Sequence, residues 1–146
     1  MGSIETKRCV LVAAGAAAEG RTGVTYAAGV SSASAGAHGL CLQLASLPPG
    51  ARSRAHRHDE HESAACVIEG QMELWFGERL EHNIVARVGE FIYIPEGVPH
   101  LVLNPSATQA AVAVLARTDP NAQEHVTELP ALDALPHLER EARHVH

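Results

Sequence analysis

Aromatic and cationic side chains are both scarce in this chain of 146 residues. Aromatic residues make up only 3% of the sequence, so the core and any pocket must be built largely from Ala, Val, Leu and Ile. Eleven Lys and Arg stand against seventeen Asp and Glu, which gives a formal net charge of −6. A nucleic-acid or anionic-membrane surface needs clustered Lys and Arg. We therefore expect neither nucleic acid nor a membrane as a partner.

Cysteine is also rare, and long apolar runs are missing. The three cysteines, Cys9, Cys41 and Cys66, are odd in number, scattered and without Cys-x-x-Cys spacing. This distribution indicates reduced thiols and a cytoplasmic location rather than a disulfide framework. No apolar run approaches the roughly 20 residues of a membrane span, and the polar start of the chain does not resemble a secretory signal.

Short apolar stretches that end at Gly or Pro recur along most of the chain. They predict strands over residues 8–14, 40–47, 63–68, 71–76, 80–88, 90–94, 100–103 and 110–117. Many short strands separated by turns are typical of a β-sandwich or barrel, and the length suits one domain. Residues 26–39 read as loop or weak strand, and residues 131–143, broken by Pro136, read as short helical turns.

Histidines gather in two blocks between residues 50 and 104. The first block contains His56, His58 and His61, and the second contains His100. A His-x-His pair places two rings on the same face of a strand, and zinc and similar divalent metals favour neutral imidazole. The sequence therefore predicts a metal site inside a β-barrel.

The spacing within the two blocks resembles that of the cupin family. The first block fits Gly-x5-His-x-His and closes at a Gly; the second fits Gly-x5-Pro-x-Gly-x2-His-x3-Asn; the fixed positions are Gly50, His56, His58 and Gly70, then Gly89, Pro95, Gly97, His100 and Asn104. The resemblance implies an all-β jelly-roll barrel with a metal near one mouth and a short helical C-terminal tail. It implies a single domain over 1–146, with a core of about 40–117, an N-terminal region 8–39 and a C-terminal extension 118–146.

The first block departs from the family where the third metal ligand is expected. Cupins usually place a carboxylate or Gln seven residues before the closing Gly, and here that residue is Ser63. Strand alternation puts His61 on the same face as Ser63, whereas a bulge would bring Glu62 to that face. We favour His56, His58, His61 and His100 as ligands, with Glu62 as the alternative to His61.

Arg52 and Arg54 precede His56 at even spacing. They are therefore predicted to share its barrel face, where they would bind an anionic group of a substrate. The alternative is that both lie on a solvated edge.

The chain also resembles the small single-domain cupins that act as cyclases in aromatic polyketide pathways of actinomycetes. The crowded His56–Glu62 block, Ser63 in place of the acid, the Gly89–Asn104 block and the Ala-rich composition carry this resemblance. It implies aldol-type ring closure of a poly-β-ketone, free or bound to a carrier protein. Four neutral imidazoles would leave the full charge on the metal and make it a strong Lewis acid. Zinc is the expected metal, with Fe, Mn and Ni as alternatives.

Other functions remain open because cupins serve many chemistries. The alternatives are an iron dioxygenase, a sugar isomerase or epimerase, and a small-molecule sensor without enzymatic activity. A homodimer formed through edge strands is the expected oligomeric state.

Overall fold

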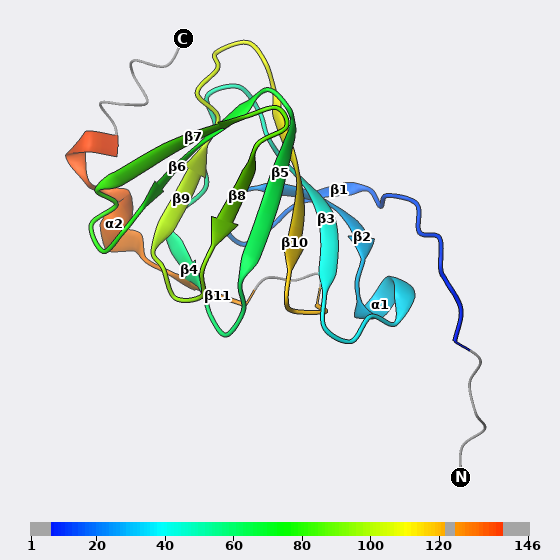
Figure 1. Ribbon diagram of the computed structural model, residues 1–146. Helices are drawn as coiled ribbons and strands as arrows, with labels where there is room; N and C mark the ends of the chain where they lie inside the picture. The colour runs from blue at the N-terminus through cyan, green and yellow to red at the C-terminus, as the bar shows by residue number, and fades with distance from the viewer. Residues whose placement is uncertain (1–6, 122–124, 139–146) are drawn as a thin grey trace.

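Two antiparallel β-sheets face each other in the computed structural model, which describes residues 7–121 and 125–138 (Figure 1). The six-stranded sheet has the order β1-β2-β3-β10-β5-β8, and the five-stranded sheet has the order β11-β4-β9-β6-β7. Two short helices, α1 (Ser32–Ala35) and α2 (Pro130–Asp133), lie outside the sheets. The strands are β1 (Ala17–Glu19), β2 (Thr25–Val30), β3 (Cys41–Leu47), β4 (His56–His58), β5 (Ser63–Glu69), β6 (Gln71–Phe76), β7 (His82–Arg87), β8 (Phe91–Ile94), β9 (His100–Leu103), β10 (Ala111–Arg117) and β11 (Val126–Glu128).

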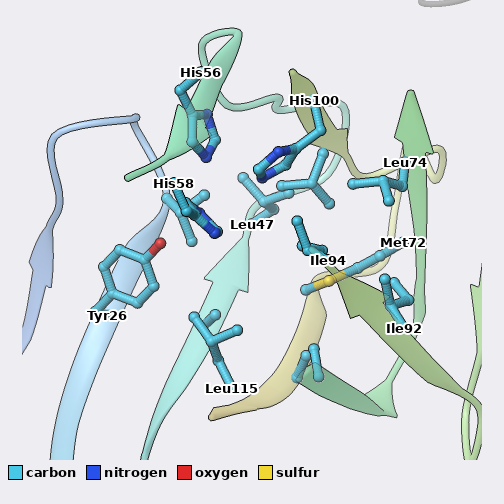
Figure 2. A pocket seen from close by; sticks show the side chains of 15 residues that line it. Tyr26, Leu47, His56, His58, Met72, Leu74, Ile92, Ile94, His100 and Leu115 are labelled. Carbon is cyan, nitrogen blue, oxygen red and sulfur yellow. The ribbon is translucent and has the colours of Figure 1, made fainter. Parts of the chain in front are cut away.

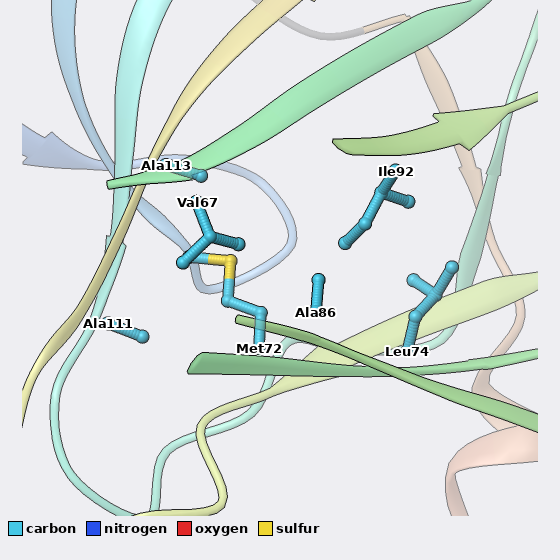
Figure 3. Close-up of a cluster of buried hydrophobic side chains, with 7 residues drawn as sticks. All are labelled: Val67, Met72, Leu74, Ala86, Ile92, Ala111 and Ala113. Atoms are coloured by element: carbon cyan, nitrogen blue, oxygen red, sulfur yellow. The ribbon is translucent and has the colours of Figure 1, made fainter. Parts of the chain in front are cut away.

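Every second side chain along a strand points into the space between the two sheets, and these side chains fill it. In β10 every second residue is buried, and the strand pairs with β3 on one side and β5 on the other. One cluster of buried side chains lies between the sheets. In it, Met72 and Leu74 from one sheet meet Val67 and Ile92 from the other (Figure 3). This apolar packing is the main term that stabilises the two-layer arrangement.

The turn between β5 and β6 depends on glycine. Gly70 has a φ of 67°, and a Cβ atom there would collide with the carbonyl oxygen of Ala110. Any side chain would therefore push β10 away from this turn, which explains why the first block closes with Gly.

The C-terminal extension covers the outer face of the five-stranded sheet. Strand β11 pairs with β4, and the chain beyond it crosses β9 and β6 (Figure 1). Leucines of the extension pack against buried residues of the sheet and of the loop after β6: Leu129, Leu132, Leu135 and Leu138 against Trp75, Leu80, Leu101 and Leu103. The all-β fold with a short helical tail is confirmed, although residues 139–143 of the expected helical stretch lie outside the described residues.

Most sequence-predicted strands appear within two residues of their expected ends, as β3 and β5 to β10. The predicted strand over residues 8–14 is wrong: these residues form no strand, and Leu11 is 98% exposed. A strand needs a neighbour for its backbone hydrogen bonds, and β1 already forms this edge of the sheet by pairing only with β2. Residues 26–39, for which the sequence left loop and weak strand as alternatives, contain most of β2 and helix α1. No helix among the described residues has the length and apolar character needed to cross a membrane.

Candidate metal centre

Three histidine rings meet at one end of the space between the sheets (Figure 2). In β4, His56 and His58 point inward while Arg57 is exposed. His56 is the direct cross-strand partner of His100 on β9. Two adjacent strands of the five-stranded sheet thus bring the rings together, and one nitrogen of each lies within 4.8 Å of the others.

Each of these rings is held through its Nδ1 atom. The Nδ1–H of His56 donates to the carbonyl oxygen of Arg54 at 2.6 Å, and that of His100 donates to the carbonyl oxygen of Val98 at 2.9 Å. The Nδ1 of His58 is 3.1 Å from the Ser63 hydroxyl. The two carbonyl acceptors fix Nδ1 as the protonated nitrogen of His56 and His100, so Nε2 is the atom through which these rings would bind a metal, while the Ser63 hydroxyl orients the His58 ring.

Burial keeps His58 and His100 neutral. It lowers the pKa of His58 from 6.5 to about 2, with further lowering from His100, His56, His61 and the Arg117 guanidinium. Burial also lowers the pKa of His100 to about 3, with a further contribution from His56 that outweighs the hydrogen bond to Val98. The cost of charging a desolvated ring next to other rings explains both shifts. Neutral imidazole is the form that binds metal.

His61 and Glu62 point in opposite directions, as strand alternation predicts. His61 and Ser63 are buried, and Glu62 is exposed. The His61 ring stacks on that of His58, with centroids 4.9 Å apart. Its Nδ1 donates to the carbonyl oxygen of Asp59 at 2.9 Å, while its buried Nε2 has no hydrogen-bond partner. His61 lies beside the three-histidine group rather than within it, so its role as fourth ligand stays a prediction.

The donor set fits a divalent transition metal. His56, His58 and His100 would hold the ion through Nε2, and the unpartnered Nε2 of His61 is a further donor beside them. Among the described residues, this group contains no carboxylate. Nitrogen-only donor sets suit zinc, nickel, copper or iron(II) better than magnesium or calcium.

The histidine group lies at one end of a small apolar cavity of about 60 Å³. Its wall is made mainly of Val, Leu, Ile, Met and Ala side chains from both sheets (Figure 2). Besides the histidines, Tyr26 from β2 supplies the polar group of the lining. A second apolar groove of about 250 Å³ shares Leu74, Ile94 and His100 with this cavity, and is also lined by Ile84 of β7 and Tyr93 of β8. The groove therefore forms an apolar route to the cavity that passes His100.

Neither Arg52 nor Arg54 lines the cavity or the groove. Arg52 donates to the carbonyl oxygen of Asp133 at 3.0 Å, and Arg54 is exposed and donates to the carbonyl oxygen of Arg21 at 2.6 Å. The expectation that both share the cavity face with His56 therefore does not hold, because residues 48–55 form no continuous strand in which alternation would operate. A substrate-binding role for them stays a prediction, and the structure gives each another partner.

Two residues near the site were missed in the sequence. Tyr26 lines the cavity, and Arg117 is 2% exposed on β10, with its guanidinium 5.9 Å from the Tyr26 ring. The alternation of Ala111, Ala113 and Leu115 already points Arg117 inward. A charged residue at an inward position of a predicted strand was the available signal.

Asn104 has a structural role. Its side-chain NH2 donates to the carbonyl oxygens of Leu47, Pro48 and Gln109, and its Oδ1 accepts from the Ser106 amide. The last fixed residue of the second block thus ties the end of β9 to the end of β3 and to the loop before β10, both in the other sheet. The two blocks are also joined directly, because the Gly97 amide donates to the carbonyl oxygen of His58 at 2.9 Å.

Comparison with known families agrees with this geometry. Residues 43–116, just over half of the chain, match the cupin domain family. The chain belongs to the cupin family. No curated protein matches this cupin.

Solved structures with the same fold share little sequence with this cupin. Oxalate oxidase in complex with glycolate is 21% identical with a TM-score of 0.61, covering 74% of this chain and 56% of its own. Lactobacillus farciminis oxalate decarboxylase in a formate complex is 14% identical with a TM-score of 0.63, covering 78% and 33%. The Schizosaccharomyces pombe Cnp3 cupin domain is 11% identical with a TM-score of 0.57, covering 66% and 64%. The chain thus spans about half the length of the oxalate oxidase, and these likenesses show the fold alone.

Proposed function

We propose that this cupin is a metal-dependent cyclase that closes a ring in a poly-β-ketone by aldol-type carbon–carbon bond formation. The observation that carries the proposal is a cluster of buried histidines without a carboxylate, set beside a cavity with an otherwise apolar wall. A divalent cation held by His56, His58 and His100 would keep its positive charge and supply Lewis-acid polarisation of a ketone oxygen.

The protein's own side chains position the substrate and exclude water from it. The apolar walls of the cavity and of the larger groove along His100 suit a largely uncharged, multi-carbonyl chain and would displace water from it. Because core side chains are close-packed, the wall limits how such a chain can fold, so one pair of carbons is brought together in preference to others. The groove along His100 admits a substrate that is either free or carried on a protein.

Tyr26 is suited to assist at the reacting carbonyl. Tyr26 lines the cavity, and Figure 2 shows its hydroxyl pointing toward His58. From there the O–H can donate a hydrogen bond to the ketone oxygen as negative charge develops on it. The buried Arg117 guanidinium near the Tyr26 ring adds a fixed positive charge, which favours an anionic enolate in the same region.

The test combines metal analysis with product analysis. Protein purified without an affinity tag is assayed by elemental mass spectrometry, and is then given a poly-β-ketone made on an acyl carrier protein by a minimal polyketide synthase. We expect one cyclised product to dominate with metal-loaded protein, and the mixture of spontaneous products to return with stripped protein. An unchanged product mixture in all samples would contradict the proposal. Oxygen consumption or carbon dioxide release with oxalate would assign different chemistry and also overturn it.

A further inference from the structure

The candidate metal centre contains no carboxylate among the described residues. The two acidic residues that flank the buried His61, Glu60 and Glu62, are both exposed and do not turn toward the centre. A divalent cation held only by neutral imidazoles keeps its full charge toward any ligand that reaches it. The charge balance of the site is therefore left to the ligand and to the side chains behind the cavity wall.

A buried guanidinium stands behind the same site. Arg117, the last residue of β10, is the direct cross-strand partner of Ser63 on β5, and both side chains are buried. The Ser63 hydroxyl is in turn 3.1 Å from Nδ1 of His58. The position at which the sequence led us to expect a carboxylate thus holds a hydroxyl, and a cation stands opposite it.

Arg117 is held in place beside Tyr26. Its Nη2 donates to the carbonyl oxygen of Asn121 at 3.3 Å and to Sγ of Cys41 at 3.8 Å. Its guanidinium carbon is 5.9 Å from the centre of the Tyr26 ring, which lines the cavity, whereas Arg117 itself does not. The guanidinium charge nevertheless reaches the site, because after burial and the neighbouring histidines it also contributes to the low pKa of His58.

We propose, on the basis of the metal centre of the proposed function, that this site binds its ligand as an anion, an enolised β-dicarbonyl compound, and that Arg117 favours the charged form. Such a compound loses a proton from the carbon between its two carbonyls. The C–H electron pair stays with the ligand, where both oxygens share the charge, and the proton passes to water. Fixed positive charge in a partly desolvated site stabilises that form over the neutral one.

The apolar surroundings favour a delocalised anion over a compact one. The cavity wall is mainly aliphatic, and the groove of about 250 Å³ that passes His100 is apolar as well. A carboxylate or phosphate is strongly hydrated, so such walls oppose its entry. An enolised dicarbonyl spreads its charge over two oxygens, and its carbon substituents can contact the walls. The Tyr26 hydroxyl, which points toward His58 in Figure 2, can donate to one of the oxygens.

The test compares diones that differ in one acidic hydrogen. Pentane-2,4-dione can lose the proton between its carbonyls, whereas 3,3-dimethylpentane-2,4-dione has no hydrogen at that carbon. We expect metal-loaded wild-type protein to bind the first about 100-fold more tightly or better, and to bind it with the absorption spectrum of the enolate. 3-Methylpentane-2,4-dione keeps one such hydrogen and should still bind, which controls for the added bulk. Equal affinity for all three diones, or no binding of any, would overturn the proposal.

Variants assign the effect to Arg117. Arg117→Met removes the charge and should weaken enolate binding by about tenfold or more, and Arg117→Lys should restore most of it. Arg57→Met is the matched control, because Arg57 is exposed on β4 and pairs with Asp59. Circular dichroism and elemental mass spectrometry verify fold and metal content. Unchanged affinity in a folded Arg117→Met protein would overturn the role of Arg117, and the comparison of diones stands whether or not that variant folds.

Enolate binding and ring closure are separable in these experiments. A wild-type protein that prefers the enolisable diones but leaves the poly-β-ketone product mixture unchanged would support the anion site and contradict the cyclase. Metal-dependent ring closure without any preference among the diones would support the cyclase and overturn the anion site.

Discussion

The two sheets of this cupin carry different kinds of residue. The five-stranded sheet supplies the three clustered histidines from β4 and β9, and its outer surface is covered by the C-terminal extension. The six-stranded sheet supplies cavity wall, such as Leu47 and Leu115, and no described segment of the chain covers its outer surface. The candidate ligands thus come from the sheet that is supported on both faces. Precise metal binding needs such support, because a ligand displaced by even a fraction of an ångström loses affinity.

The strongest test of this division compares a residue from each sheet. His100→Ala removes a ligand from the five-stranded sheet and should lower metal affinity by about 1,000-fold or more, because a two-histidine site binds divalent ions weakly. Leu115→Ala shortens a wall residue of the six-stranded sheet and should lower stability by roughly 2–4 kcal/mol while leaving metal content unchanged. Elemental mass spectrometry and urea unfolding measure the two effects. Full metal occupancy in His100→Ala would contradict the assignment of the centre.

Lowering the pH should destabilise the protein mainly through two histidines of the five-stranded sheet. The pKa of His58 is lowered to about 2 and that of His100 to about 3, against an ordinary value of 6.5. Below pH 6.5 these two histidines are protonated in the unfolded chain but stay neutral in the folded chain. The free energy of unfolding therefore falls as the pH drops toward the folded-state pKa values. We expect the metal-free protein to lose roughly 4 kcal/mol between pH 6.5 and 4.5.

Unfolding in urea across this pH range measures the slope. His100→Asn should reduce it by about half, since one of the two shifted groups is removed. A flat profile in the wild-type protein would show that the rings are not held neutral by burial.

The role of His61 can be separated from that of Glu62 by two neighbouring substitutions. His61 is buried with an unpartnered Nε2 beside the cluster, and Glu62 is exposed. His61→Ala should lower metal affinity by about 10- to 100-fold, the range typical of residues that support or complete a metal site. Glu62→Ala should have no effect. Titration against a chromophoric chelator measures both affinities, and the reverse order of effects would restore Glu62 as the ligand.

The sequence predicted the ligand-bearing part of the fold well because local signals agree there. Gly and Pro mark the ends of the strands from β5 to β9, and the spacing of His56, His58 and His100 is itself local. Alternation failed for Arg52 and Arg54, since it holds only inside a continuous strand. Strand propensity failed for residues 8–14, since a strand also requires an available edge.

The covering of the five-stranded sheet could not be predicted, because it depends on tertiary contacts. Strand β11 has three residues, and α2 has no side-chain cap. Their positions are fixed by pairing with β4 and by the leucines that they bury. Short elements of this kind have little intrinsic preference for their conformation.

The smallest expected effect concerns Asp133, which links the C-terminal extension over the five-stranded sheet to the chain just before β4. Its Oδ1 accepts from the buried Ala55 amide at 2.8 Å, and it lies 3.6 Å from an Arg52 nitrogen. Asp133→Ala leaves that amide without a partner and should cost about 1–2 kcal/mol of stability, with a few-fold loss of metal affinity as β4 loosens. Glu78→Ala, at an exposed site, is the matched control and should stay within about 0.5 kcal/mol of wild type. If Asp133→Ala binds metal and unfolds like wild type, then β9 alone positions β4, and the covered outer surface contributes nothing to the centre.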